Sequence, residues 1–454
     1  MSPPDHTVSR TRPPAGRHLR TFTSLAAAGL VEAVLSSLGL VALVRMTGTE
    51  ISGQVIFAQS VASVCFLLCD PRLDNTVQRY VPLEERRTGQ GFALFTRLLR
   101  WDLTIRVSAI GVCLAVVMTA RLLGFVSTDL ALMLALAFVA RGSLAANGAV
   151  RAAFPLANRL HDLGLLRLGC AILSFLLALA GLLAGGPLGY LIGQALGSVV
   201  TATVVGTLGT RRLRAEIGPS AAKVPIPAGL VAFTVKATTG TALAEVSDSG
   251  ILTVAGLLGG STLVTIIKIA SAPGRLYSTL VMPVASMLHP RLARAAAAGE
   301  ERTLARRDLM RATALLTVAG VLTLLLVLPV IGDALRLVYG REYTGIGAVA
   351  ALLVAAACVK GMVCWSNVLP LALGRPGWRL AYLAAEGVLL LGALLIADLT
   401  SSGALHTALS FAWGTLLVSV LGTGVWMALL QRISAPAGDR ADTAAEHCAV
   451  HTRR

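Results

Sequence analysis

The residues Phe22–Val44 read FTSLAAAGLVEAVLSSLGLVALV, a run of almost continuous apolar side chains. A helix that crosses the hydrocarbon of a bilayer needs about 20 such residues. A secretory signal has an apolar region of only about 7 to 15 residues, followed by a small-residue cleavage site. This run is longer and continues into the polar residues RMTGTE. We therefore expect Phe22–Val44 to be a first membrane span that the chain retains.

The composition of the whole chain agrees with this expectation. Of its 454 residues, 55% are hydrophobic and 14% are charged, and the mean hydropathy is +0.76. Soluble domains are about 25% charged. Apolar runs of similar length predict about twelve spans, at 22–44, 51–80, 102–123, 129–150, 163–184, 187–208, 227–250, 258–288, 309–331, 344–370, 379–398 and 404–430. The expected fold class is an all-α polytopic membrane protein.

The basic residues predict how the spans are oriented. Connections rich in Arg, with clusters such as RTRPPAGR, EERR, GTRRLR and RLAR, alternate with connections that are poor in Arg. Because basic connections stay in the cytoplasm, both termini are expected there. The net charge of +16 could also suggest nucleic acid as a partner, but the Arg residues form short clusters between apolar runs rather than a basic face. We therefore expect no nucleic-acid partner.

The longest basic connection between early and late spans divides them six and six. We predict a cytoplasmic amino-terminal tail at 1–21, an N-lobe at 22–208, a cytoplasmic linker at 209–226, a C-lobe at 227–431 and a cytoplasmic carboxy-terminal tail at 432–454. Halves that enter the membrane from the same side are typical of a repeat related by a pseudo-two-fold axis along the membrane normal.

Two corresponding spans carry a matching interruption. The second span reaches DPRL at Asp70–Leu73, and the eighth reaches APGRL at Ala272–Leu276. Since proline removes a backbone donor and clashes with the preceding turn, Pro71 and Pro273 are each expected to kink or open their helix. Interrupted spans at corresponding places in two halves point to a transport site.

Ionisable residues within the predicted spans are costly and by default face a polar interior. Near the span ends, Arg106, Glu245 and Asp248 could instead snorkel to the interface. The deeper charges either line a polar cavity or form structural ion pairs, such as Lys236 with Glu32 or Lys360 with Glu386. Deep cations outnumber deep carboxylates, which favours an anionic passenger, and Arg can bind phosphate in a bidentate way. We predict that a phosphate-bearing headgroup is bound by Arg72, Arg79, Arg141, Lys236, Lys268 and Arg275.

Motifs for catalysis and metal binding are missing from the sequence. It contains no GxxxxGK[ST], HExxH or GxSxG pattern, and its seven Cys residues lack the paired spacing or nearby His of a zinc site. We therefore expect no enzymatic activity, no cofactor and no metal site.

Several segments resemble a known family. The segment GQVIFAQSVASVCFLLCDPRLDNTVQRYVP (Gly53–Pro82) resembles the second span of the polysaccharide (O-antigen) flippases of the multidrug/oligosaccharidyl-lipid/polysaccharide exporter (MOP) superfamily. Ser247–Gly299 is similar to that family's seventh-to-eighth span region, YGREY (Tyr339–Tyr343) resembles its external turn, and Leu369–Leu380 resembles its loop between spans ten and eleven. The resemblance covers Phe22 to Gln431. One departure is DPRLD, which stands where a small glycine-containing turn is usual.

The resemblance implies a function. A flippase of this kind moves a lipid-linked oligosaccharide across the bacterial plasma membrane by alternating access between two six-helix lobes, in the biosynthesis of cell-surface polysaccharides such as the lipopolysaccharide O-antigen. Its implied partners are the bilayer, the lipid-linked glycan, a polysaccharide polymerase and glycosyltransferases. An ion gradient would drive it, and the candidate carboxylates for ion coupling are Glu32, Asp248 and Glu386. Two alternatives remain open: a small-molecule antiporter of the same superfamily, and a non-transporting scaffold for glycan enzymes.

Overall fold

The computed structural model of the chain describes residues 15–69, 73–145, 148–157, 159–220, 224–297, 303–340, 343, 345–372 and 376–433. The longer elements within these residues are all helices. They are α1 (Ala15–Cys69), α2 (Leu73–Thr88), α3 (Gly91–Leu122), α4 (Thr128–Ala145), α5 (Gly148–Leu156), α6 (Leu160–Ile217), α7 (Leu230–Ala297), α8 (Thr303–Val327), α9 (Ile331–Tyr339), α10 (Gly347–Met362), the 3₁₀ helix η2 (Cys364–Asn367), α11 (Leu369–Ala372), α12 (Pro376–Thr400) and α13 (Ala404–Ile433).

Three of these helices are too long to cross a membrane once. Helices α1, α6 and α7 contain 55, 58 and 68 residues. At about 1.5 Å per residue each would be roughly 80 to 100 Å long, whereas the hydrocarbon core is about 30 Å thick. Each is instead two helices joined at glycines with non-helical angles, which are Gly48 in α1, Gly185 and Gly186 in α6, and Gly260 in α7.

The turns in α1 and α7 have nearly the same backbone conformation. Gly48 has φ 76° and ψ 178°, and Gly260 has φ 70° and ψ −170°. A residue with a Cβ atom is strained at such φ values, so glycine is required at both turns. The first two spans of each half are therefore joined by the same kind of turn, as a repeat would require.

The two arms of α6 pack directly against each other. A Cβ atom on Gly181 would lie 2.0 Å from the carbonyl oxygen of Gly189, and one on Gly193 would lie 2.1 Å from that of Leu177. Both contacts join residues on opposite sides of Gly186, so the arms are antiparallel. Small residues allow this close approach of backbones, which stabilises helix pairs within a bilayer.

Together the described residues make twelve crossings. By length and composition, eight of the described helices could span a membrane, and Gly347–Met362 is a shorter apolar helix. Since α1, α6 and α7 each supply two crossings, the total is twelve. The outer surface is apolar, as shown by Val107, Val112 and Leu122 of α3, which are 67%, 63% and 79% exposed. The predicted all-α, multi-pass membrane fold is confirmed.

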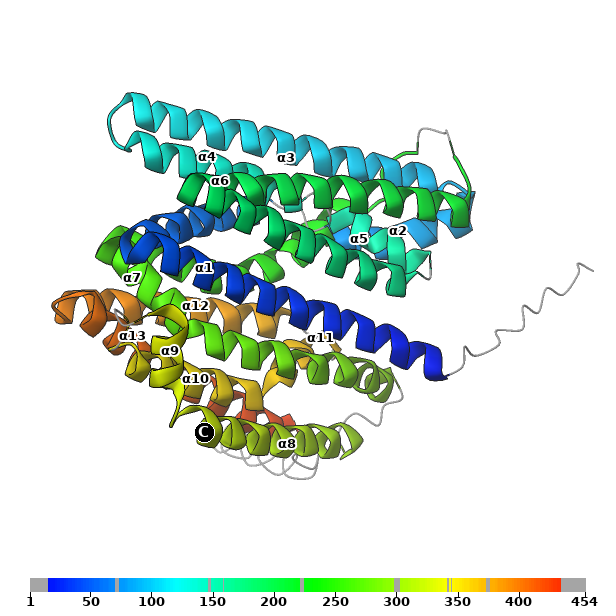
Figure 1. Cartoon of the computed structure of the whole chain (residues 1–454). Helices are drawn as coiled ribbons and strands as arrows, with labels where there is room; N and C mark the ends of the chain where they lie inside the picture. The colour runs from blue at the N-terminus through cyan, green and yellow to red at the C-terminus, as the bar shows by residue number, and fades with distance from the viewer. Residues whose placement is uncertain are drawn as a thin grey trace, which may run out of the picture.

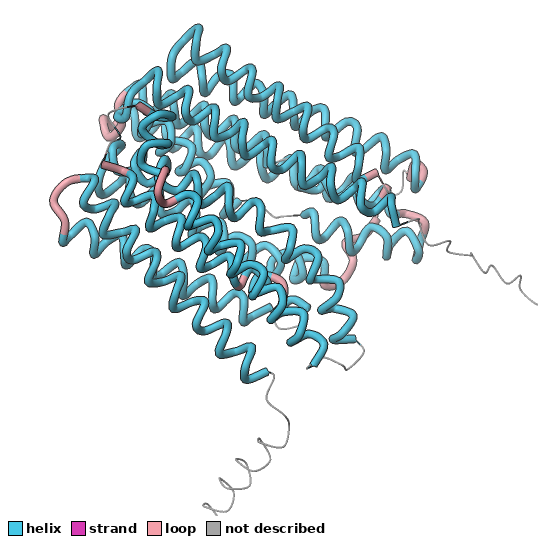
Figure 2. The backbone as a smooth tube through the Cα atoms, turned by 60° about the horizontal axis from the view of Figure 1, so that its bottom comes forward, coloured by secondary structure: helices cyan, strands magenta, loops and turns pink. Residues whose placement is uncertain are grey.

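Helices α1 and α7 lie at the centre of the molecule. Figure 1 shows α3, α4 and α6 on one side of this pair and α8, α10, α12 and α13 on the other. We call the end where α1 and α7 reverse direction the hairpin end, and the opposite end, where α1 begins and α13 finishes, the terminal end. The tube in Figure 2 shows long helices running side by side between loops at these two ends.

The two halves contact each other at the hairpin end. The Thr265 hydroxyl of α7 donates a hydrogen bond of 2.8 Å to the backbone carbonyl of Thr49 in α1. A Cβ atom on Gly53 would lie 2.1 Å from the carbonyl oxygen of Ser261. Arg45 of α1 donates to the carbonyls of Leu337 and Val338 in α9.

The structure bears on two predictions about the spans, an opening at Pro273 and a single tenth span at 344–370. Along the described α7 the backbone leaves helical angles at Gly260, while Pro273 lies within the helix, so the span is not opened there. A Cβ atom on neighbouring Gly274 would lie 3.1 Å from the Ala357 Cβ atom, so α10 packs closely on this turn and supports it. Pro71 lies outside the described residues.

The predicted tenth span, 344–370, is likewise not one helix. Helix α10 ends at Met362 and the chain continues as the 3₁₀ helix η2. The side chain of Trp365 in η2 is fully buried, and its indole N–H donates a hydrogen bond of 2.8 Å to the Thr313 hydroxyl of α8. A buried indole needs such a partner, and this anchoring accounts for the break.

Candidate functional site

A cavity of about 410 Å³ lies beside the central pair of helices. Most of its lining comes from the first half, namely from α1, α4, α5 and α6. The second half contributes Ser249, Leu252, Lys268 and Arg275 of α7. Pockets for small molecules usually have volumes of about 300 to 1,000 Å³, so the cavity has the size of a ligand site.

Basic side chains dominate the charge of the lining. Five cationic residues line the cavity, Arg141 of α4, Arg151 of α5, Arg167 of α6, and Lys268 and Arg275 of α7. Among the described lining residues Glu32 of α1 is the carboxylate that faces them. A cleft lined mainly by one sign of charge concentrates ligands of the opposite sign. The cavity therefore favours an anion.

Glu32 forms an ion pair with one of these cations. The Arg167 Nη2 atom lies 2.6 Å from the Glu32 Oε2 atom, and the two side chains are 35% and 51% exposed. The pair joins α1 to α6, both in the first half of the chain. The sequence had suggested Lys236 as the partner of Glu32, whereas the structure pairs Glu32 with Arg167.

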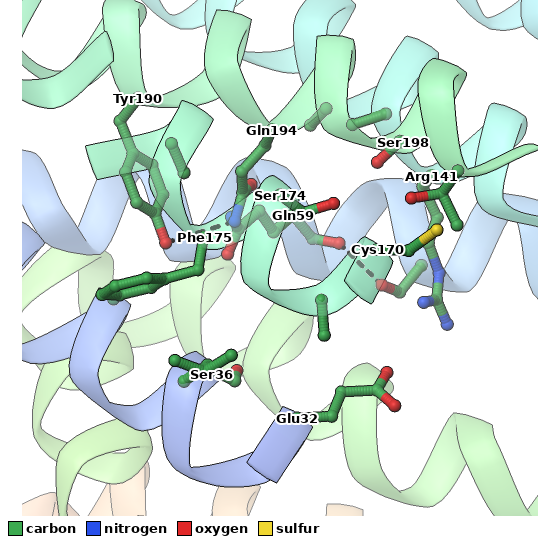
Figure 3. Close-up of a pocket in the computed structure, with 18 of the residues that line it drawn as sticks. Glu32, Ser36, Gln59, Arg141, Cys170, Ser174, Phe175, Tyr190, Gln194 and Ser198 are labelled. Carbon is green, nitrogen blue, oxygen red and sulfur yellow. Dashed lines mark hydrogen bonds between the residues drawn. The ribbon is translucent and has the colours of Figure 1, made fainter. Parts of the chain in front are cut away.

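Neutral polar and aromatic groups also line the cavity. Gln59 Nε2 donates a hydrogen bond of 2.7 Å to Gln194 Oε1, and Gln194 Nε2 donates one of 3.2 Å to the Tyr190 hydroxyl. Figure 3 shows Tyr190 and Phe175 together on one side of the view, and Arg141 on the other. The aromatic rings of Tyr190 and Phe175 thus lie across the cavity from Arg141.

The structure brings together three of the six predicted anion-binding residues. Arg141, Lys268 and Arg275 line the cavity. Arg79 does not, because it lies exposed on α2 with its guanidinium 4.6 Å from the centre of the Phe233 ring. Arg72 lies outside the described residues, as does the side chain of Lys236.

The candidate coupling carboxylates are spread apart. Glu32 lines the cavity, whereas Glu386 lies on α12, outside the lining, where its buried carboxylate is paired with Lys360. This pair is the structural ion pair that the sequence offered as an alternative. The side chain of Asp248 lies outside the described residues.

Sequence reasoning missed other polar groups of the site. Arg151 and Arg167 stand close to the ends of predicted spans, where basic residues indicate topology rather than a site. The amides of Gln59 and Gln194 lie within predicted spans, and this was the signal that could have found them.

A buried ion pair in α3 was missed as well. Arg106 Nε donates a hydrogen bond of 2.8 Å to Asp102 Oδ1, and the two side chains are 2% and 0% exposed. Arg106 therefore does not snorkel to the membrane surface. The spacing of four residues, which places both groups on one helix face, was the signal for this pair.

We compared the chain with known proteins. No protein-family model matches the sequence, and no curated protein matches it. Solved structures do match. An outward-facing multidrug resistance MATE family transporter of the MOP superfamily has a TM-score of 0.63 and 12% identity, with 92% of this chain and 96% of that chain covered. The chain has the fold of MATE transporters.

Two further structures agree. A MATE transporter from Vibrio cholerae has a TM-score of 0.60 and 13% identity, covering 91% of this chain and 97% of that one. A MOP superfamily transporter from Pyrococcus furiosus is described as having a binding pocket of reverse polarity. It has a TM-score of 0.61 and 11% identity, with 92% of this chain and 96% of that chain covered. At such low identities the likeness concerns the fold. The resemblance of the sequence to the polysaccharide flippases stays a prediction.

Proposed function

We propose that this chain is a secondary transporter that moves a small organic anion across a membrane by alternating access. The observation that carries the proposal is the lining of the cavity, with Arg141, Arg151, Arg167, Lys268 and Arg275 facing Glu32. Arg side chains bind phosphate and carboxylate groups through paired hydrogen bonds. The fold, and the multidrug resistance role of one structural neighbour, support a small solute.

The contacts between the halves support the alternating cycle. In this structure α1 and α7 meet at the hairpin end through the Thr265 hydrogen bond and through the close approach of Gly53 to Ser261. We propose that these contacts break when the cavity opens toward the hairpin end. With both termini in the cytoplasm, as the basic connections predict, this structure would be closed on the outer side.

A lipid-linked glycan is the second candidate passenger. Its phosphate groups would meet the same five cations, which is the observation that favours it. A cavity of about 410 Å³ could hold a headgroup but not a long glycan. Under this proposal the protein would act in the bacterial plasma membrane beside a polysaccharide polymerase and glycosyltransferases.

Uptake by proteoliposomes that contain the purified protein would test both candidates. We expect saturable uptake of a small organic phosphate such as glycerol 3-phosphate, and none of an organic cation such as ethidium. A second arm would follow the flipping of a fluorescent polyprenyl-diphosphate sugar between leaflets. Flipping without uptake of the small anion would favour the lipid-linked glycan. Uptake of ethidium alone would contradict an anionic passenger of either kind.

A further inference from the structure

We propose that Glu32 is a tethered counter-ion, which occupies Arg167 while the carrier is empty and which the anionic group of the passenger displaces. This inference rests on the proposed transport of an anion. It assigns Glu32 to tuning how tightly the anion is held, and it names the passenger's phosphate or carboxylate as the group that takes the place of the Glu32 carboxylate.

The geometry of the pair fits a contact that can exchange partners. Arg167 Nη2 and Glu32 Oε2 lie 2.6 Å apart, yet the two side chains are 35% and 51% exposed, and both residues line the cavity. Ion pairs between exposed groups are worth little, because water screens them and both side chains lose conformational freedom. An incoming phosphate, which accepts two hydrogen bonds from a guanidinium, can therefore replace the single contact to Glu32.

The helices that carry the pair are held together without it. Leu43 of α1 and Ala178, Leu182 and Tyr190 of α6 are buried in one apolar cluster. A Cβ atom on Gly39 would lie 3.4 Å from the Tyr190 hydroxyl, so α1 and α6 are in contact there. Because both partners lie in the first half of the chain, the pair does not lock one half against the other. The position of the pair in the cavity therefore points to a role in ligand binding rather than in packing.

A transporter must release what it binds. Five cations in one cavity would hold an anion tightly, and tight binding slows dissociation. The Glu32 carboxylate competes with the passenger for Arg167. This competition is effective because the covalent attachment of Glu32 to α1 keeps the local concentration of its carboxylate high. The passenger binds less tightly as a result, and it leaves faster.

The test compares Glu32→Gln with Arg167→Gln and with the double variant. The probe is glycerol 3-phosphate, measured by calorimetric binding to the full chain in detergent and by uptake into proteoliposomes. For Glu32→Gln we expect about two- to fivefold tighter binding, as the loss of an exposed ion pair allows. We also expect a lower KM together with a lower kcat. Arg167→Gln should weaken binding, and adding Glu32→Gln to it should have little further effect.

Asp162→Asn is the matched control. Asp162 also pairs with an arginine on α6, since its Oδ2 atom lies 3.7 Å from Arg212 Nη2, but it lies outside the cavity lining. This variant should leave binding and uptake unchanged. A purely structural role for Glu32 would lower the thermal midpoint without tightening binding.

The outcomes separate the two proposals. If the wild-type protein binds and transports no anion, the proposed function fails and the role of Glu32 fails with it. If the wild-type protein binds the anion and Arg167→Gln weakens binding, but Glu32→Gln binds equally or less tightly, transport of an anion stands and the counter-ion role is overturned.

Discussion

At the scale of single residues, the cations that line the cavity should contribute more to anion binding than cations outside it. Arg141→Gln removes a guanidinium from the lining. A hydrogen bond to a charged group contributes about 1.5 to 3 kcal/mol, so we expect at least roughly tenfold weaker binding of glycerol 3-phosphate by calorimetry. Arg212→Gln, on the exposed pair with Asp162, is the control. Equal losses in the two variants would contradict the site.

The second residue-scale prediction concerns the pair formed by Lys360 and Glu386. The Glu386 carboxylate is buried, and a buried acceptor without its partner costs about 1 to 3 kcal/mol. Lys360→Met should therefore lower the thermal midpoint of unfolding in detergent. Lys360→Arg keeps the positive charge and should retain most of the stability. A Lys360→Met protein as stable as the wild type would show that the pair is not structural.

At this scale the sequence predicted residue types better than partners. Arg141 and Lys268 were predicted from their depth within apolar spans, and Arg275 from the APGRL interruption, and both signals can be read along the chain. The partner of Glu32 could not be predicted, because Arg167 is distant in sequence and reaches α1 only through the packing of α6. Asp102 and Arg106 are four residues apart, so this pair could have been found from the sequence.

At the scale of elements, the glycine turns of α1 and α7 should be sensitive to substitution. Gly48 has φ 76° and ψ 178°, where a residue with a Cβ atom costs about 1 to 3 kcal/mol. We expect Gly48→Ala to lower the thermal midpoint of unfolding. Gly29→Ala, in the same helix with no atom near its Cβ position, should be neutral or stabilising. Equal effects of the two substitutions would mean that the turn tolerates a Cβ atom.

Most helices were predictable because a membrane span requires a long apolar run. Turn positions were less so. The reversal between the first spans of the second half falls at Gly260, after the predicted boundary, because the chain reverses where a glycine can adopt a positive φ. The break after α10 depends on the contact between Trp365 and Thr313, which joins distant segments and leaves no local signal.

At the scale of the whole molecule, Arg45 should hold the hairpin end closed. It donates to the last carbonyls of α9, so one side chain links α1 of the first half to the second half. Nearby, burial raises the pKa of Tyr339 to about 12, so this tyrosine stays neutral at physiological pH. We expect Arg45→Gln to raise the population with a separated hairpin end.

Spin labels at the exposed Met46 and Leu337 would measure this change as a longer distance. Arg121→Gln is the control, because Arg121 bonds to Thr128 within the first half. An unchanged distance distribution in Arg45→Gln would show that the halves are held by their backbone contacts alone.

The unequal lining of the cavity has an evolutionary consequence. Nearly all of the surface that meets a passenger belongs to α1, α4, α5 and α6, while the second half contributes only a few side chains from α7. Drift in the first half can therefore change what is carried without altering how α10, α12 and α13 pack. Among homologues that carry different solutes, we expect sequence differences to be concentrated on the cavity-lining faces of α1 and α6. The sequence of the second half should differ less.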